Sequence, residues 1–350
     1  MHKIFTTADI EWELRDGAEM LRALLPNIWA HRAFASSSRF SFGNTGAILM
    51  FHEVQEDPEC ELRTGCSAGF LDTILRGLIA AGWDIVTLEE GLRRIRCATG
   101  NRFVVITFDD GYRDTASRAR PILERYSAPF TVYVPTAAIT RELNAWWLGL
   151  RWIFKNHDVV RIDAMKRKFV CSSLPAKVKA LRKTLAWIAQ DFSVLPMLSE
   201  TFQVYHVRMD ELVARYCFDG DTLKQLARNP LVTIGGHTST HRPLSLLQED
   251  QMLHEIRDNR AFLEGLIDTK VEHLSYPYGT VQACGEREFA ASLRLGFRSA
   301  VTAEKSHRLR RHMRLHRLPR IDVTGRYWRT ICNEMSHGVR TKPSTVQRRS

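Results

Sequence analysis

The chain has 350 residues, 44% of them hydrophobic, which is enough apolar material for one large α/β domain or two smaller ones and excludes a disordered polymer. No run of about eighteen apolar residues occurs, so no membrane-spanning helix is expected. The formal net charge of +11 favours anionic partners such as nucleic acid, anionic lipid head groups or acidic glycans, although a basic soluble enzyme with solvated Lys and Arg is the plainer interpretation.

The cysteines and the first residues bear on the compartment. Seven cysteines occur, an odd number, and none forms a CxxC pair of the metal-binding type, so reduced and mostly packed thiols are expected. Acidic residues occupy the N-terminal stretch where a signal peptide would be apolar. We therefore expect a cytoplasmic protein whose basic surface makes peripheral contact with an anionic inner membrane. The basic connector Lys305–Arg314 is either a solvated face or a contact for an anionic lipid or glycan.

The two ends of the chain differ from its middle. Residues 1–46 predict a helical extension and a linker, because apolar residues recur at helical spacing between Asp9 and Ala30 and a Gly-Asn-Thr-Gly stretch follows. Residues 337–350 predict a basic, disordered tail.

Strands and helices alternate over residues 47–336, and this order predicts parallel βα units. The seven expected strands are Ala47–His52, Phe103–Phe108, Phe130–Val134, Val232–Gly235, His273–Tyr276, Ser299–Thr302 and Leu318–Asp322. The expected helices are Phe70–Ala81, Leu88–Ile95, Asp114–Tyr126 with an interruption at Pro121, Glu249–Leu266 and Glu286–Leu295.

A long stretch, Arg141–Pro230, separates the third and fourth strands. It is rich in Lys and Arg, so a mostly helical insertion is expected, including the segments Val159–Lys168 and Ala176–Ile188. Its Trp146 and Trp147 either stack on sugar rings or pack in the core of the insertion, and both alternatives stay open.

Two neighbouring carboxylates, Asp109 and Asp110, follow the strand Phe103–Phe108 directly. In α/β folds the carboxyl ends of strands carry the chemistry. Two carboxylates on an apolar strand are costly unless a cation lies between them. For this pair alone, an Asp-Gly turn followed by a helix cap is the simpler explanation.

Two further strands end in candidate site residues. Val232–Gly235 is followed by His237 and His241, and one carboxylate with two imidazoles is typical of a catalytic divalent-metal site. The segment His273–Gly279 ends in an aromatic-Pro-aromatic-Gly turn, which could equally be a rigid turn with packed rings.

Three short segments follow one another along the chain: TFDDG at Thr107–Gly111, HTSTH at His237–His241 and YPYG at Tyr276–Gly279. They resemble the first three motifs of the NodB-homology polysaccharide deacetylases, carbohydrate esterase family 4, and the resemblance covers roughly Ala47–Asp322. It implies a distorted seven-stranded (β/α) barrel. It also implies a metal-dependent hydrolase that removes N-acetyl groups from amino sugars of an oligo- or polysaccharide, or of a glycan precursor, so the expected partner is an N-acetylated glycan.

The resemblance further implies roles for single residues. Asp109 would be the base that takes a proton from metal-activated water, and Asp110, His237 and His241 would bind a divalent ion. Zinc is favoured for this site, with cobalt, nickel and manganese as alternatives. The backbone N–H of Tyr278 would stabilise the oxyanion.

Two positions depart from the family pattern. Ser275 stands where the third motif usually has an Arg that holds the catalytic Asp; Arg320 is the candidate substitute, with an exposed strand-end charge as the alternative. The usual Leu-x-His motif of the general acid is not evident. His316 is one candidate, but His52 is favoured, because a subgroup of these deacetylases carries a His on an N-terminal strand of a circularly permuted barrel; a core histidine is the alternative for His52.

Two functions compete with deacetylation. A non-catalytic carbohydrate-binding pseudoenzyme of the same fold is disfavoured by the retained Asp and His residues, but the missing Arg of the third motif keeps it open. Nucleic-acid binding has no recognisable motif, so no specific nucleic-acid partner is expected. The sequence does not define the oligomeric state.

Overall fold

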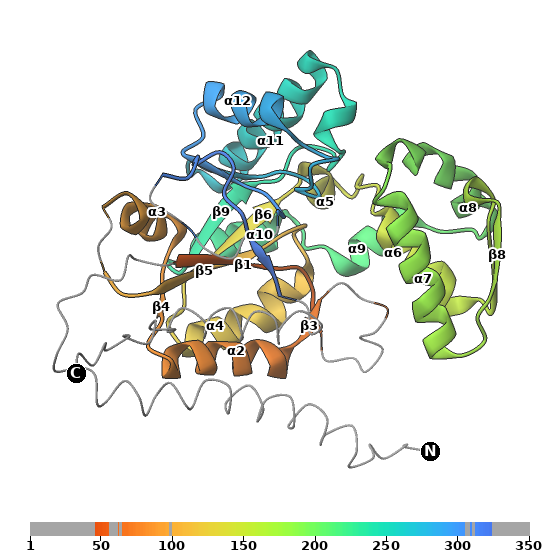
Figure 1. Cartoon of the computed structure of the whole chain (residues 1–350), viewed down its shortest axis with the longest axis horizontal. Helices are drawn as coiled ribbons and strands as arrows, with labels where there is room; N and C mark the ends of the chain where they lie inside the picture. The colour runs from red at the N-terminus through yellow and green to blue at the C-terminus, as the bar shows by residue number, and fades with distance from the viewer. Residues whose placement is uncertain are drawn as a thin grey trace, which may run out of the picture.

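The structure, a computed structural model, describes residues 46–55, 62, 65–97, 100–304, 309 and 312–323. A central sheet is wrapped by helices, and the insertion forms a smaller helical lobe at its side (Figure 1). The expected N-terminal extension, apart from Gly46, the expected tail over residues 337–350 and most of the connector Lys305–Arg314 lie outside the described residues. Within the described part, no helix combines the length and apolar composition that a membrane crossing needs.

The central sheet is parallel, with the strand order β11-β10-β9-β6-β5-β1-β12. Its strands are β1 (Gly46–Phe51), β5 (Phe103–Phe108), β6 (Phe130–Val134), β9 (Val232–Gly236), β10 (His273–Ser275), β11 (Ser299–Val301) and β12 (Ile321–Asp322). All seven expected strands are confirmed, although the last is shorter than the expected Leu318–Asp322. The short β4 (Asp84–Ile85) pairs with the start of β5.

The sheet curls until its two ends meet. Ile321 pairs with Leu49 of β1, while Leu318 just before it exchanges hydrogen bonds with Ala300 and Thr302 at β11. The segment that contains Leu318 and β12 therefore lies between β1 and β11 and closes the sheet. This arrangement confirms the predicted distorted (β/α) barrel.

Side chains of the strands alternate between two buried layers. Ile48, Val105 and Tyr133 belong to the cluster inside the barrel, together with residues of α3 (Leu88–Cys97), which covers the end where the strands begin. Leu49 and Ile106 belong to the cluster on the outside. Both faces of the strands are covered, which explains why they occur in the sequence as continuous apolar runs.

Helices cover the outer face of the barrel, as Figure 1 shows. They are α2 (Ala68–Ala80), α4 (Arg120–Arg125), α10 (Gly220–Ala227), α11 (Glu249–Ile267) and α12 (Glu286–Arg294). Around Pro121 the chain stays helical but its geometry changes: a π-helical turn, Thr115–Ala119, precedes α4, and the proline lies in the first turn of α4. Short strands β2 (Val54–Gln55) and β3 (Cys66–Ser67) pair at the side of the barrel.

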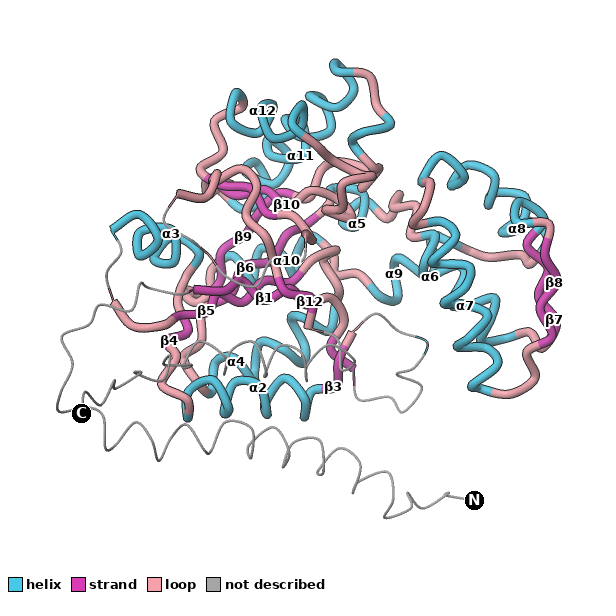
Figure 2. Tube along the Cα trace, viewed as in Figure 1, coloured by secondary structure: helices cyan, strands magenta, loops and turns pink. Residues whose placement is uncertain are grey.

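The insertion forms its own lobe with its own core. Its elements, with those that lead into it, are α5 (Thr136–Thr140), α6 (Trp146–Asn156), β7 (Val159–Ile162), β8 (Arg167–Val170), α7 (Leu174–Ile188), α8 (Leu198–Val204) and α9 (Met209–Tyr216). The helix expected over Val159–Lys168 is wrong: β7 and β8 form an antiparallel hairpin at the outer edge of the lobe (Figure 2). The reason is that buried and exposed side chains alternate with the period of two of a strand. Val160 and Ile162 are buried in the lobe core, while Val159 and Arg161 are exposed.

Candidate active site

Side chains from several strands meet at the carboxyl end of the barrel. Asp110 follows β5, and His237 and His241 follow β9. One ligand atom from each of these three buried residues lies within 4.8 Å of the others; Asp110 Oδ1 is 3.4 Å from His237 Nε2 and 3.2 Å from His241 Nε2. One carboxylate and two imidazoles at this spacing fit a divalent cation and leave coordination positions for water or substrate.

The backbone of the site is unusual at the same residues. Asp110, Thr238, His241 and Tyr278 all have positive φ, between 58° and 69°, although none is glycine. Such a conformation is costly for residues with a Cβ and is found where a surrounding structure holds it for function. The folded barrel and its loops therefore fix these side chains in place.

Helix α11 supports the segment that carries the two histidines. The Asn259 side chain accepts from the His237 N–H at 2.9 Å and donates to Val134 O at 3.0 Å. The Glu255 carboxylate accepts from the Thr240 N–H at 2.8 Å. Sequence reasoning missed both residues. Their signal was two polar residues four positions apart inside the buried stripe of an amphipathic helix.

The two histidines are held in different ways. His237 Nδ1 donates to Ser275 O at 2.7 Å, which directs Nε2 toward Asp110. Burial opposes a charge on this ring, but Asp109 and Asp110 raise the pKa of His237 overall. Burial lowers the pKa of His241, although Asp110 opposes the effect, and neutral imidazole is the form that binds a cation. His241 Nδ1 is buried and has no hydrogen-bond partner among the described residues.

Asp109 is held by a buried arginine. Arg320 is 2% exposed, and its guanidinium donates from Nη1 to Asp109 Oδ1 at 2.7 Å and from Nη2 to Oδ2 at 2.6 Å. The same side chain contacts Thr107 and Ser275, so it runs through the inside of the barrel and is not the exposed charge that was its alternative. Burial would raise the pKa of Asp109, but the guanidinium outweighs it and the pKa is lowered, so the carboxylate is the stable form.

The structure separates the two candidate acids. His52 directly follows β1, whose Phe51 pairs with Phe108 of β5, and the Asp109 N–H donates to Phe51 O at 3.0 Å, so His52 and Asp109 follow neighbouring strands at the same level. His316 lies on the outer side: its Nδ1 is 2.9 Å from Ser292 Oγ of α12, and its carbonyl accepts from the Tyr276 hydroxyl. His52, and not His316, is therefore brought to the cluster.

Tyr278 borders the site through its ring and its backbone. The ring centroid is 4.8 Å from that of His241, and no backbone carbonyl in the part of the chain described accepts from the Tyr278 N–H. Gly279 follows with φ 58°, and a Cβ there would lie 2.3 Å from the backbone nitrogen of Ala303. Only glycine fits this close approach, which fixes the turn that presents the Tyr278 N–H.

The tryptophans of the insertion face the site. Trp146 is 7% exposed, and its Nε1 donates to the Tyr278 hydroxyl at 2.8 Å, so its ring is packed and is not a free platform for a sugar. Trp147 is partly buried, with its ring 5.1 Å from the His241 ring. The packing alternative therefore describes Trp146.

A buried ion pair ties the insertion to the strand end that bears His52. Glu53 is fully buried, and Arg151 Nη1 of α6 donates to both carboxylate oxygens, at 2.8 and 2.6 Å. The Arg151 guanidinium also lies 4.7 Å from the centre of the Tyr216 ring. Sequence reasoning missed this pair, because nothing local relates residues that the fold brings together from two different lobes.

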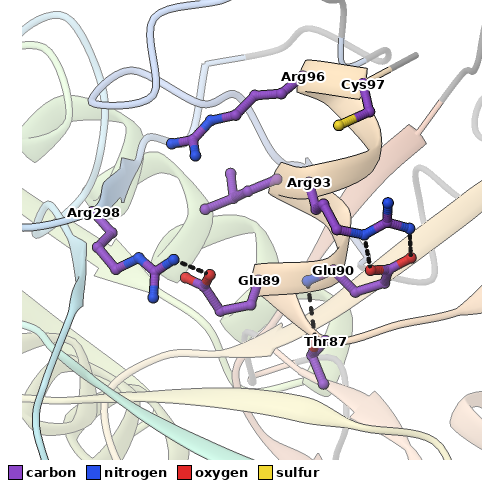
Figure 3. Close-up of a pocket in the computed structure, with 8 residues that line it drawn as sticks. Thr87, Glu89, Glu90, Arg93, Arg96, Cys97 and Arg298 are labelled. Atoms are coloured by element: carbon purple, nitrogen blue, oxygen red, sulfur yellow. Dashed lines mark hydrogen bonds and ion pairs between the residues drawn. The ribbon is translucent and has the colours of Figure 1, made fainter. Parts of the chain in front are cut away.

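A cavity of about 520 Å³ lies at the other end of the barrel, between α3 and Arg298 (Figure 3). Two ion pairs lie among its lining residues, Arg298 with Glu89 and Arg93 with Glu90. It contains none of the candidate site residues, and its place at the amino end of the strands is typical of stability and not of catalysis.

A family model described as polysaccharide deacetylase matches residues 97–295. No curated protein matches the chain. IcaB from Ammonifex degensii shares the fold, with a TM-score of 0.56 at 16% identity over 83% of this chain and 97% of that one. So do the Streptococcus pyogenes deacetylase PplD in complex with acetate (0.54, 17%, 80% and 93%) and a de-N-acetylase from Aggregatibacter actinomycetemcomitans (0.54, 14%, 82% and 100%). Because the family model covers more than half of the sequence, the chain belongs to the polysaccharide deacetylase family, whose members are hydrolases acting on carbon–nitrogen bonds.

Proposed function

We propose that the chain is a metal-dependent hydrolase that removes N-acetyl groups from amino sugars of an oligo- or polysaccharide or a glycan precursor. One observation carries the proposal: two adjacent carboxylates have different partners. Asp110 faces the two histidines, whereas Asp109 is paired with Arg320 and stays outside the ligand set. Metal-assisted amide hydrolysis needs one carboxylate that binds the cation and one that acts as a general base without binding it.

Each residue then has one task. Asp110, His237 and His241 would hold a divalent ion, with zinc favoured, which would act as a Lewis acid and lower the pKa of water. Asp109 accepts the proton of the attacking water, and Arg320 keeps its carboxylate ionised and oriented.

The remaining two groups act on the two ends of the amide, its carbonyl oxygen and its nitrogen. The Tyr278 N–H donates to the oxygen that becomes negative as water adds to the acetamide carbonyl. His52 protonates the departing nitrogen, since an amine is a poor leaving group without a proton. The position of His52 supports this role, because it is half-buried and follows the strand β1 next to β5, which Asp109 follows.

The comparisons support removal of an acetyl group as the reaction. Two proteins of similar fold are described as a deacetylase in complex with acetate and as a de-N-acetylase. The pseudoenzyme alternative rested on the missing third-motif arginine. It is not favoured, because Arg320 holds Asp109 from another strand.

The decisive experiment measures acetate release from a panel of N-acetylated glycans by the purified chain, before and after chelation, and again after zinc is restored. We expect release that the chelator abolishes and zinc restores. Glycan binding without acetate release by the metal-loaded protein would favour the pseudoenzyme and contradict the proposal.

We also propose that the protein works in the cytoplasm, in peripheral contact with an anionic membrane. Five described cysteines are free thiols, as is usual in a reducing compartment: Cys66, Cys97, Cys171, Cys217 and Cys284. The hairpin of the insertion exposes Arg161 and Lys168 as a cross-strand pair beside Val159 and Val170. Cell fractionation tests the location, and co-sedimentation with anionic against neutral vesicles tests the contact.

A further inference from the structure

One helix of the insertion, α6, reaches three sides of the candidate site. Trp147 contacts His241, Trp146 contacts Tyr278, and Arg151 pairs with Glu53 next to His52. The family's chemistry assigns no role to an insertion, and an added lobe could equally have packed against the outside of the barrel. Its first helix instead packs against the catalytic end.

The contact between Trp147 and His241 supports a ring that lacks the usual hydrogen bond behind it. A histidine that binds a metal usually donates its other ring nitrogen to a fixed acceptor, which sets the orientation of the ring. His237 has such an acceptor in Ser275 O. His241 has none, since its Nδ1 is buried without a hydrogen-bond partner among the described residues. Its ring lies instead against two aromatic rings, Trp147 at 5.1 Å and Tyr278 at 4.8 Å between centroids.

Trp147 is itself fixed. Its Nε1 donates to the Tyr112 hydroxyl at 2.7 Å, and Tyr112 is 1% exposed and follows the Asp109-Asp110-Gly111 turn. The indole is therefore anchored to the loop that carries Asp110 while its face supports His241. Two contacts, from Tyr112 to Trp147 and from Trp147 to His241, therefore join the loop of one ligand residue to the ring of another through the insertion.

Trp146, the neighbouring residue, acts on a different part of the site. Its Nε1–H bonds the Tyr278 hydroxyl, and its ring lies at 29° to the Tyr278 ring, with 6.2 Å between centroids. Phe192 of the same lobe also contacts that ring, with 4.4 Å between centroids. Tyr278 has a φ of 63°, a costly conformation that is kept only where the surrounding structure holds it, and these ring contacts are part of that structure.

We propose that α6 is a positioning element of the active site, in which Trp147 orients the ligand His241 and Trp146 orients the turn that presents the Tyr278 N–H. The inference rests on the proposed function for the metal site and the oxyanion donor. It predicts that two adjacent tryptophans affect two different steps, metal binding and turnover, so each serves as the control for the other.

Zinc affinity tests the first half. Competition with a chromogenic chelator gives the dissociation constant, and the absorption spectrum of the cobalt(II)-loaded protein reports the ligand geometry. We expect Trp147→Leu to weaken zinc binding about 10- to 100-fold, the usual cost of losing support behind a ligand, and to change the cobalt spectrum. Trp147→Phe and Tyr112→Phe should produce smaller changes in the same direction.

Trp152→Phe is the matched control. Trp152 lies on the same helix and contacts His157, away from the site. If the tryptophans were purely structural, Trp147→Phe and Trp152→Phe would both lower the unfolding temperature. Both would leave the zinc dissociation constant and the cobalt spectrum as in the wild type.

Turnover tests the second half. Trp146→Phe and Tyr278→Phe each remove one partner of the same hydrogen bond and leave the backbone N–H of residue 278 in place. We expect both to lower kcat to a similar extent, on the order of tenfold at most, with zinc affinity and KM close to wild type.

The inference is overturned if folded Trp147→Leu binds zinc within twofold of the wild type with an unchanged cobalt spectrum. Should that variant fail to fold, wild-type affinity in both Trp147→Phe and Tyr112→Phe overturns it equally. An unchanged kcat in Trp146→Phe would contradict the role of Trp146 in orienting the turn at Tyr278. A wild-type protein that binds no zinc and releases no acetate would instead defeat the proposed function, and this inference with it.

Discussion

Arg320 donates two hydrogen bonds to the carboxylate of Asp109, although 211 residues separate them in the sequence. The guanidinium arrives from the residue just before β12, whereas the family's third motif would supply it from the position of Ser275. Ser275 remains part of the arrangement, since its hydroxyl lies 2.9 Å from Arg320 Nη2 and 3.2 Å from Asp109 Oδ2. An arginine can thus fix this carboxylate from a different strand, because both strands line the same narrow interior.

The first prediction concerns this pair. Arg320→Lys replaces a planar fork with a single point charge, so the carboxylate loses its fixed orientation, and we expect kcat for acetate release to fall about 10²-fold. Metal content should stay at the wild-type level, because Arg320 does not contact the three ligands. Ser275→Ala, which removes only the shared hydroxyl, is the matched control and should cost far less. Wild-type turnover in Arg320→Lys would show that Asp109 needs no such partner.

The second prediction separates the two carboxylates. Asp109→Asn should lose about 10²–10⁴ in kcat and keep its metal, because Asp109 takes a proton and does not bind the ion. His237→Ala combined with His241→Ala should lose the metal itself. Elemental analysis of both proteins, side by side with kinetics, makes the comparison. The assignment is wrong if the double variant holds as much metal as the wild type.

The third prediction concerns the general acid. His52→Ala should lose about 10²–10⁴ in kcat on the acetamide and much less on an activated ester, whose leaving group needs no proton. His316→Ala is the control, since His316 contacts α12 outside the barrel, and its rate should be close to wild type. The reverse pattern, a harmless His52→Ala and an inactive His316→Ala, would place the acid on the C-terminal strand.

The fourth prediction concerns the ion pair between Glu53 and Arg151. Arg151→Met removes the guanidinium that donates to both oxygens of a fully buried carboxylate, and we expect a loss of about 3–5 kcal/mol in the free energy of unfolding. Adding Glu53→Gln to the same protein should recover a large part of this loss. Urea denaturation of the two single variants and the double variant measures the coupling. Additive losses in the double variant would mean that the pair contributes nothing beyond its separate parts.

The fifth prediction concerns pH. Burial raises the pKa of Asp114 to about 7, and the charge of Glu53 adds to the effect. An unfolded Asp has a pKa of about 3.9, so the folded state holds this proton more tightly and stability falls as pH rises from about 4 to about 7. Asn cannot ionise, so Asp114→Asn should stabilise the metal-free protein at pH 8 and have little effect at pH 4.5, a difference worth about 1.4 kcal/mol per unit of pKa shift. Chemical denaturation at the two pH values is the test, and an equal effect at both would contradict the shifted pKa.

Local sequence was enough for most of the fold. The strand Phe103–Phe108 and helix α7 were predictable because apolar runs and amphipathic stripes are properties of neighbouring residues. The hairpin β7–β8 was missed, although Val159–Ile162 alternates between exposed and buried positions, because four residues are too short a window to outweigh a long helical context.

The sequence by itself determined the family, the barrel and the identities of Asp109, Asp110, His237 and His241, because each motif directly follows a strand and the carboxyl ends of parallel strands meet at one rim. Only the tertiary structure decided which arginine holds Asp109, which histidine lies beside it and what supports His241. Those relationships join residues far apart along the chain, such as Trp146 and Tyr278 at a separation of 132. They exist only after the barrel has closed and the insertion has packed against its rim, and no local pattern in the sequence records which distant side chains that packing brings into contact.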